Sequence, residues 1–274
     1  MRRILVALGL IGLISPVLAA DYDLPTLRGS DVFVPAFPVY PHWDGFYVGG
    51  QLSYGNLHAD FINATAPMVQ FSLRNTNILD QMSPDQWQVL GSNEAGAGGL
   101  GGFVGYNWQF DRAIVGVEFN YIHSSFSAGA PSSPLGRRQT VDGLITDVTL
   151  DASGSLHITD LATARARFGW AVDQFMPYMT IGLATARADV SLSTQALVTQ
   201  RDPTTLLVVG QFLFSNAQIK SAAYMWGYSG GGGLDWALTQ NLFVRADYEY
   251  ISLSPVVKIT SHLNIAHLGL GVKF

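Results

Sequence analysis

The strongest constraint on the fold is a recurring stretch of about ten residues in which two kinds of side chain alternate. In the first such stretch, "GFYVGGQLSYG" from Gly45 to Gly55, apolar residues at every second position are interleaved with small or polar ones. A period of two is the period of a β-strand whose faces meet different surroundings. About ten residues is also the length that a tilted membrane-crossing strand needs. The segment is therefore predicted to be a strand with lipid on one side and a polar interior on the other.

Seven further segments show the same alternation, which gives eight predicted strands. They cover residues 98–108, 113–122, 160–171, 175–186, 223–238, 242–251 and 265–274. The sequence thus predicts an all-β fold, an eight-stranded antiparallel transmembrane β-barrel. The apolar stretch at 204–214 could extend a hairpin beyond the membrane, cover the mouth of the barrel or form an adhesive patch. A ten-stranded barrel that uses this stretch is the alternative architecture.

The links between these strands alternate in length. Short links at 109–112, 172–174 and 239–241 alternate with long ones at 56–96, 123–159, 187–222 and 252–264. Outer-membrane barrels have short periplasmic turns and longer external loops, so both chain ends are expected on the periplasmic side. Aromatic residues gather at both ends of the predicted strands, as in the girdles of membrane proteins. A soluble sandwich with an aromatic core, the competing interpretation, does not predict two girdles.

The segment before the first strand indicates export. Residues 1–20 contain two arginines, an apolar run and then small residues, the three parts of a cleaved secretory signal peptide. Residues 21–42 hold four prolines without periodicity and are predicted to be an irregular periplasmic segment. Residues 43–274 are expected to form the barrel domain, located in the cell outer membrane.

Composition excludes several classes of protein. Only 13% of the residues are charged, about half the usual share in a soluble protein. Removing Arg2 and Arg3 leaves 13 basic residues against 20 acidic ones, a net charge of −7 that disfavours nucleic acid as a partner. The chain has no cysteine, which excludes disulfides, thiolate metal sites and thiol nucleophiles.

The inward positions of the predicted strands carry four acidic and four basic residues. These are Glu118, Arg165, Arg167, Asp235, Arg245, Asp247, Glu249 and Lys273. An eight-stranded barrel is only wide enough inside to be filled by side chains, and buried charges there must pair. We expect a mutually neutralised lumen core, with a narrow gated conduction path as the alternative. No pair of acids has an evident route for substrate, so no catalytic residues are assigned.

The end of the chain carries a further pattern. Leu268, Leu270, Val272 and Phe274 alternate with small or polar residues up to the final aromatic. This pattern resembles the signal that the bacterial outer-membrane assembly machinery reads, and that machinery is a predicted partner.

Four histidines lie in or beside the predicted external loops: His58, His123, His157 and His262. Imidazole can bind haem iron, but none of these residues shows tight ligand spacing, so they are weak haem candidates and no metal site is predicted. His123 and Ser125 share a face of one strand, as in some outer-membrane enzymes that act on lipid A. The sequence assigns them no acid partner, and we expect no enzymatic activity.

One motif formally matches a nucleotide-binding pattern. "GAGGLG", residues 96–101, fits G-x-G-x-x-G. That pattern requires a preceding strand and a following helix, whereas here a predicted strand follows. We interpret these glycines as space for neighbouring strands or for large groups in the lumen.

Several blocks together resemble one known family. They are "WDGFYVGGQLSYGN", "GGFVGYNWQFDRAIVGVEFNY", "TARARFGW", "GYSGGGGLDWALTQNLFVRADYEYISL" and "HLGLGVKF". The chain is similar through these strands and turns to small alphaproteobacterial outer-membrane β-barrel proteins, the porin-like surface antigens, some of which bind haemin. The resemblance implies an eight-stranded barrel, surface display, and roles in envelope integrity and host contact. The external loops are longer here, and no haem-ligand motif matches.

These observations predict an integral outer-membrane barrel with a structural and surface-interaction role and no cofactor. A small-solute porin is the second hypothesis and a haem-binding surface receptor the third. The expected partners are outer-membrane lipid, lipopolysaccharide and a host or surface ligand of the external loops.

Overall fold

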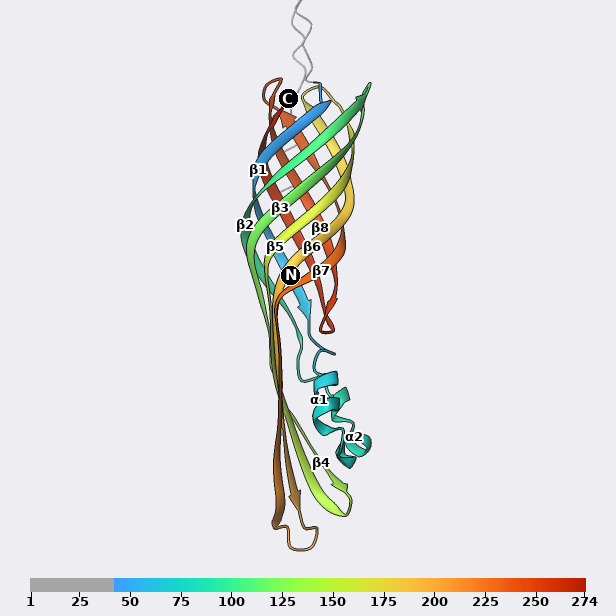
Figure 1. Cartoon of the computed structure of the whole chain (residues 1–274), viewed down its shortest axis with the longest axis vertical. Coiled ribbons are helices and arrows are strands. Elements are labelled where there is room, and N and C mark those ends of the chain that lie inside the picture. Colours follow the sequence, from blue (N-terminus) through green and yellow to red (C-terminus); the bar gives the residue numbers. More distant parts are fainter. Residues whose placement is uncertain (1–41) are drawn as a thin grey trace, which may run out of the picture. The chain divides into compact units, whose positions relative to one another are not determined.

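The computed structural model describes residues 42–274; the predicted signal peptide and nearly all of the proline-rich segment lie outside this range. The described residues belong to one compact unit. It consists of a single antiparallel sheet with two short helices (Figure 1). Neither helix in the described range has the length and apolarity needed to cross a membrane.

Nine strands make up the sheet. They are β1 (Gly45–Asp60), β2 (Ser92–Phe110), β3 (Ala113–Ala130), β4 (Leu135–Val141), β5 (Leu144–Trp170), β6 (Phe175–Arg201), β7 (Val208–Ala237), β8 (Leu242–Val256) and β9 (Ile259–Lys273). β1 pairs with both β2 and β9, and β3 pairs with β5, so eight strands close into a ring. β4 lies outside the ring and pairs only with β5. The predicted eight-stranded barrel is confirmed, and the ten-stranded alternative is wrong.

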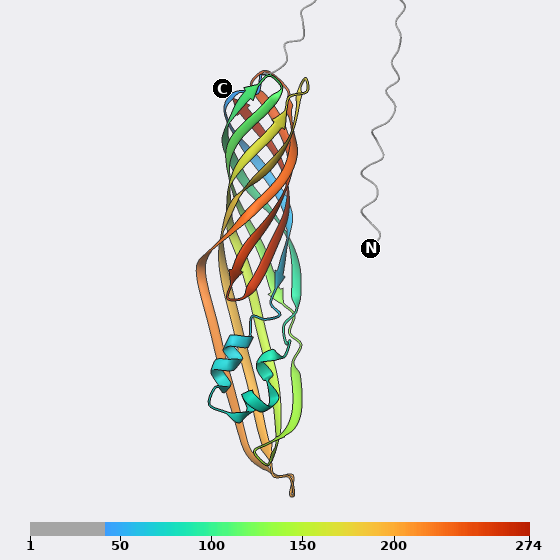
Figure 2. The same cartoon turned by 90° about the vertical axis from the view of Figure 1, so that its right-hand side faces the viewer.

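Two of the predicted external loops are mostly strand. Residues 123–159 complete β3, form β4 and begin β5, and residues 187–222 complete β6 and begin β7. These extensions continue the sheet well beyond the ring (Figure 2). We call residues 126–158 and 190–220 the stalk. The apolar stretch 204–214 belongs to it, as the end of the β6–β7 turn and the start of β7.

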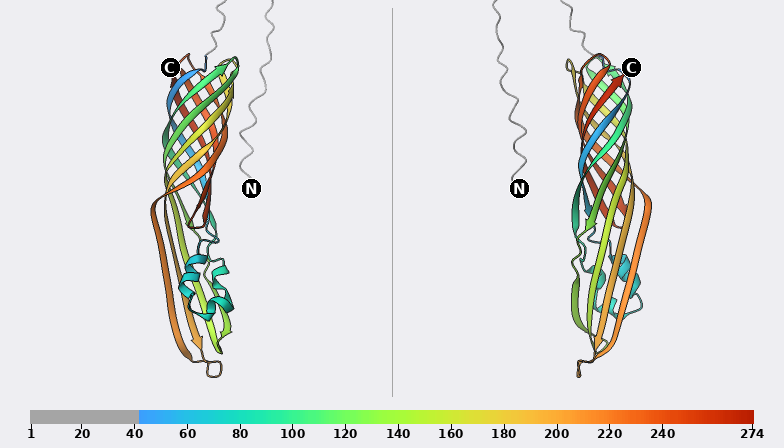
Figure 3. Two further views of the ribbon diagram at one scale, coloured as in Figure 1. Left: turned by 45° about the vertical axis from the view of Figure 1, so that its right-hand side comes forward. Right: turned by 90° about the vertical axis from the view of Figure 1, so that its left-hand side faces the viewer.

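A belt of β-bulges marks the boundary between barrel and stalk. The pairing register shifts between His123 and Phe126, between Ile158 and Asp160, and between Ala188 and Val190. Bulges bend strands and are common at barrel rims. They allow the tilted barrel strands to straighten into the stalk, as the two views in Figure 3 show.

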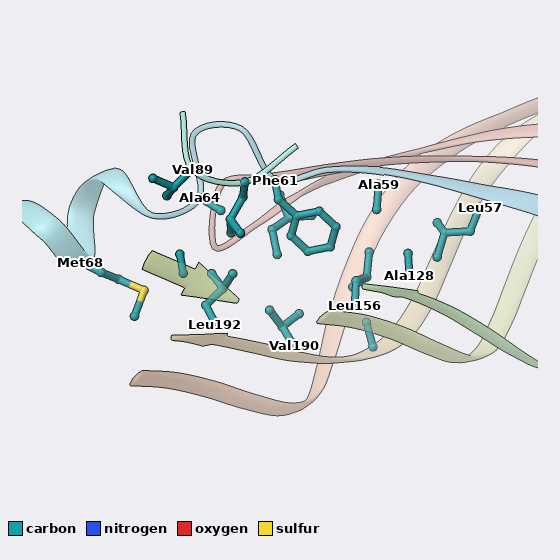
Figure 4. Close-up of a cluster of buried hydrophobic side chains, with 14 of the residues drawn as sticks. Leu57, Ala59, Phe61, Ala64, Met68, Val89, Ala128, Leu156, Val190 and Leu192 are labelled. Carbon is teal, nitrogen blue, oxygen red and sulfur yellow. The ribbon is translucent and has the colours of Figure 1, made fainter. Parts of the chain in front are cut away.

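The first external loop does not extend beyond the stalk but folds against it. It contains α1 (Ala66–Leu73), α2 (Asn77–Met82) and a 3-10 turn (Pro84–Gln86). Met68 of α1 belongs to the same buried apolar cluster as Phe61, Leu156 and Leu192, which are at most 4% exposed. Figure 4 shows these side chains between the loop and the inner face of the stalk. This cluster is the core of the stalk and also covers the external mouth of the barrel.

A second, smaller apolar cluster fills the opposite, periplasmic end of the barrel. Its members are Trp43, Tyr47, Phe103, Ile114, Met176, Tyr178, Ala237 and Phe243. Phe243 meets Trp43 and Tyr47 edge to face, at 6.1 and 6.0 Å between ring centroids. Such arrangements are favoured by the ring quadrupoles. The barrel interior is therefore apolar at both ends.

The outer surface of the ring is apolar, as a lipid-facing surface must be. Leu100, Ile181 and Leu183 point outward and are 66%, 64% and 68% exposed. On the same two strands, Asn107 of β2 and Thr180 of β6 point inward and are buried. This is the alternation from which the strands were predicted.

Candidate functional site: the charged interior and the external stalk

Glu118 is the centre of the charged interior. It lies on β3, and its fully buried carboxylate receives three guanidinium groups. Arg245 Nη1 lies 2.7 Å and Arg167 Nη1 3.3 Å from Glu118 Oε2, and Arg165 binds Oε1. The hydroxyl of Tyr47 donates to Oε2 at 2.7 Å. One carboxylate thus joins strands that are far apart in the sequence.

A second acid, Asp235 on β7, completes the arginine pairing. Arg245 binds it in a bidentate manner, with Nε 2.9 Å from Oδ1 and Nη2 3.1 Å from Oδ2. Arg167 Nη2 donates to Asp235 Oδ2 at 2.8 Å. Arg167 also lies over the ring of Tyr178, 3.9 Å from its centroid, and Arg245 lies over Phe103 at 4.0 Å. Bidentate pairing and stacking are the geometries that the planar guanidinium favours.

Two further acids on β8 extend the network toward the stalk. Arg165 Nη1 lies 3.1 Å from Glu249 Oε2, and its Nη2 lies 3.6 Å from Asp247 Oδ2. Tyr178 donates its hydroxyl to Asp247 at 3.0 Å. His267 Nε2 lies 3.5 Å from Glu249 Oε2. The buried acids are therefore matched by arginines, tyrosines and a histidine.

Seven of the eight predicted lumen charges are brought together, and Lys273 is the one that is not. Its Nζ lies over the ring of Trp43, 5.4 Å from the centroid, at the periplasmic end. No acid of the described range forms an ion pair with it. The network instead includes His267, Tyr47 and Tyr178, which the sequence analysis did not assign to it. All three stand at inward positions of the period-two pattern, which is the signal that could have identified them.

Inward glycines supply the space for the large buried groups. Arg165 stands opposite Gly182 on β6, and Arg245 stands opposite Gly269 on β9. A β-carbon at position 182 would collide with the backbone of Ala164 and lie 2.8 Å from the Cα of Arg165. Glycine in a strand often marks such a close approach. This arrangement explains why a barrel with a crowded interior contains so many glycines.

The charged interior is closed at both ends. The side chains of Glu118 and Arg245 are fully buried, and the two apolar clusters lie on the periplasmic and stalk sides of them. Buried charges that are paired and hydrogen-bonded hold their partners in fixed positions, because losing one partner is costly. The arrangement can brace the barrel, but it presents no charged surface to solvent.

The four histidines are spread over the rim and the stalk. His58 on β1 stands directly opposite His262 on β9, a proximity that their sequence separation conceals. His58 Nδ1 lies 3.3 Å from Glu94, and His262 stacks on Tyr250. His157 lies in the stalk part of β5. No three histidine or acidic side chains of residues 42–274 are placed to hold a metal ion together.

His123 has an acid partner that the sequence could not assign. Its Nδ1 lies 2.9 Å from Asp160 Oδ1, across the β3–β5 pair, and Tyr121 donates to the same oxygen at 2.6 Å. Ser125 points to the same side of β3, but among the described hydrogen bonds none joins it to His123. The imidazole is therefore oriented without being coupled to a nucleophile.

The residues of the predicted assembly signal lie on the lipid-facing side. Leu268, Leu270 and Val272 are outward residues of β9, and Phe274 follows the strand. The amide of Phe274 donates to the carbonyl of Phe46 at 2.9 Å, and the two rings are 6.1 Å apart. The final aromatic thus joins the first and last strands of the ring. Its role as an assembly signal stays a prediction.

The outer membrane protein beta-barrel domain model matches residues 32–274, most of the chain. The chain belongs to this family. Among curated proteins it is similar to the 25 kDa outer-membrane immunogenic protein of Brucella ovis, with 24% identity over 85% of this chain and 78% of that protein. It is also similar to the 31 kDa outer-membrane immunogenic protein of Brucella melitensis, with 27% identity over 86% of this chain and 79% of that protein.

Solved structures of small outer-membrane proteins align with the chain at low similarity. Ail, the attachment invasion locus protein of Yersinia pestis, has a TM-score of 0.35 and 13% identity over 84% of this chain and 99% of its own. Neisserial surface protein A has a TM-score of 0.37 and 15% identity over 84% of this chain and 97% of its own. The family and the Brucella relatives place the protein in the outer membrane. These relatives are named as outer-membrane immunogenic proteins and not as enzymes.

Proposed function

We propose that the protein is a closed, non-catalytic barrel that reinforces the outer membrane and holds a rigid stalk for contact at the cell surface. One observation carries the proposal: a single buried apolar cluster runs from the external mouth of the barrel into the stalk. It includes Leu57 and Ile265 of the ring as well as Val148 and Val198 of the stalk. Such a core fixes the stalk to the barrel and covers the mouth at the same time.

The closed interior favours this function over a small-solute porin. The three arginines around Glu118 are paired with it and with Asp235, Asp247 and Glu249, and these side chains are at most 2% exposed. In a porin, by contrast, the lumen is a water-filled channel. A resident cofactor forms no part of the proposal. The proposed partners are the lipid and lipopolysaccharide around the ring, the assembly machinery, and a ligand met by the stalk.

The first test is electrical. The chain without its signal peptide is refolded, checked for a heat-modifiable band on a gel, and inserted into planar bilayers. We expect a heat-modifiable but silent protein, because both ends of the lumen are filled. Discrete and stable current steps would support the porin and refute the closed barrel.

The second test concerns the surface role. A strain lacking the protein is compared with the same strain complemented by the full chain, for detergent sensitivity and for attachment to host cells. We expect the deletion to raise detergent sensitivity and to reduce attachment to host cells, and we expect complementation to restore both. Normal detergent resistance together with normal attachment in the deletion strain would overturn the proposed function.

A further inference from the structure

The turn between β6 and β7 presents an apolar tip at the far end of the stalk. Leu206, Leu207, Val208 and Val209 are consecutive and are 61%, 68%, 52% and 57% exposed. Because Arg201 pairs with Ile145 at the start of β5, this turn reaches beyond the β4–β5 turn, as Figures 1 and 2 show. Clustered exposed apolar residues usually mark an interaction site.

The backbone amides of this turn are hydrogen-bonded within the turn. Asp202 Oδ1 accepts from the amides of Thr204 and Thr205, each at 2.8 Å. The amide of Asp202 donates to the carbonyl of Leu207 at 3.0 Å, and the amide of Leu206 donates to the carbonyl of Asp202 at 2.9 Å. In water such bonds are optional, whereas in hydrocarbon every backbone polar group needs a partner. Because its amides already have partners, the turn loses fewer hydrogen bonds on entering an apolar phase than an open loop would.

Leu206 adopts a backbone conformation that is uncommon for leucine. Its φ is +59°, in the left-handed region where glycine and asparagine are the usual occupants. A leucine there costs backbone energy and gains little burial within the molecule, since the residue is 61% exposed. Burial of this side chain against a binding partner would offset the backbone strain.

The charge and shape of the tip identify the kind of partner. No ionisable side chain occurs between Pro203 and Ile219, and the Asp202 carboxylate faces its own turn. A convex tip cannot enclose a small molecule, which binds in concave sites. A peptide could add as a strand only along the free edge of β7, which begins at Val208, because the amides of Thr204, Thr205 and Leu206 are occupied. An uncharged lipid surface needs neither a cavity nor free amides.

We propose that the tip formed by residues 204–209 inserts into the surface of a facing zwitterionic lipid bilayer. About 14 residues separate the rim from the tip along β6, or roughly 45 Å of strand, so the protein's own membrane is out of reach. The inference rests on the proposed surface-contact function and names its partner as a lipid. Insertion is expected to be shallow, because Arg201 and Asp147 form an ion pair just behind the tip.

The test uses the full chain in nanodiscs and separate phosphatidylcholine vesicles. Since the chain has no cysteine, Thr204→Cys gives one site for an environment-sensitive fluorophore. We expect the nanodiscs to float with the vesicles, with blue-shifted emission that does not depend on salt. The double variant Leu206→Asn/Leu207→Asn should bind about a hundredfold more weakly, because two apolar side chains are lost.

This variant is chosen to preserve the fold, since asparagine tolerates the left-handed conformation at position 206. Ile219→Asn is the matched control, because Ile219 is 72% exposed but lies near the barrel end of the stalk. It should bind vesicles normally. Absence of vesicle binding by the wild-type chain, or equal binding by the tip variant, would overturn the inference.

Other outcomes separate this inference from the proposed function. Nanodiscs that pair with one another but ignore vesicles would indicate strand pairing along the free edge of β7, and the lipid partner would be wrong. Attachment of whole cells that survives the tip variant would refute the lipid contact and leave the surface role intact. Vesicle binding by a protein whose deletion changes neither attachment nor detergent resistance would refute the surface role instead.

Discussion

The barrel and the stalk are built largely from the same strands, but the apolar side chains point outward in the barrel and inward in the stalk. Along β5, Arg165 and Arg167 point into the ring while Phe168 faces lipid, whereas above the bulge Leu156 points inward and Ser155 outward. Inside the membrane the solvent is apolar, so the strand places its charges in the interior. Outside it the solvent is water, and the apolar residues form the interior. The bulge belt is where one strand changes between the two arrangements.

This comparison shows that the two regions are stabilised by different interactions. The ring depends on an ionic network that would be costly to disrupt, and the stalk depends on an apolar core shared with the first external loop. A buried charge left without its partner is destabilising by several kcal/mol, whereas an exposed ion pair contributes little. Substitutions matched between the regions therefore test the comparison.

The largest effect is expected at the centre of the network. Glu118→Gln keeps the side-chain shape but leaves Arg165, Arg167 and Arg245 with one fewer negative charge among them. We expect the free energy of unfolding to fall by about 3–5 kcal/mol, measured as the urea midpoint of the heat-modifiable band in detergent.

The matched change in the stalk is Asp147→Asn. Asp147 pairs with Arg138 on the stalk surface, where hydrogen bonding from that guanidinium lowers the pKa of the carboxyl. Because the pair is partly exposed, its loss should cost less than about 1 kcal/mol. Equal costs at the two sites would mean that water reaches the lumen charges and that the two regions do not differ as described.

A second substitution tests the core of the stalk. Leu192 on β6 is fully buried in the apolar cluster of the stalk, and Leu192→Ala should destabilise the stalk by about 2–5 kcal/mol through loss of contact and a residual cavity. Hydrogen exchange should rise in the stalk parts of β6 and β7 while the ring keeps its gel shift. The adjacent outward change Ser191→Ala should stay within about 0.5 kcal/mol. A loss of the gel shift in Leu192→Ala would show that the two regions unfold together.

Much of the ring could be predicted because one pattern encodes it. Period-two alternation identified all eight ring strands, and inward positions such as Glu118 and Arg245 followed directly from it. The pairing of these charges could not be derived, because it depends on which strands face each other across the lumen. For that reason Lys273 was included and His267 was left out.

Most of the stalk was not predicted, although its sequence also alternates; an extended hairpin was one of the possibilities only for residues 204–214. Val148, Leu150, Leu156 and Ile158 occupy every second position or multiples of it, but with serine, threonine and aspartate between them. The expectation of membrane-length strands ended each one at the rim, where the bulge also shifts the phase. The His123–Asp160 and His58–His262 pairs could not be predicted either. The sequence of one strand does not determine its register with a neighbouring strand.

The third expected effect concerns the glycines of the ring. Gly182→Ala places a methyl group against Ala164 and Arg165, and overpacking of this kind costs about 1–3 kcal/mol. Gly230→Ala is the control, because its added carbon would face outward with its nearest neighbour 3.8 Å away. That change should be neutral or stabilising by roughly 0.4–1 kcal/mol. Similar urea midpoints for the two variants would argue that the close approach of β5 to β6 at Gly182 does not require glycine.

The smallest expected effect lies at the tip of the stalk and depends on pH. The amides of Thr205 and Thr204 donate to Asp202 and lower the pKa of its carboxyl. A lowered pKa means that the turn is stabilised above the unfolded value of about 3.9 and loses this contribution as pH falls through the folded pKa. The amide resonances of Thr204 and Thr205 should therefore shift only below about pH 4. Asp202→Asn keeps an acceptor oxygen and removes the titration, so its spectra should not change over this range; an acid transition in that variant would place the titrating group elsewhere.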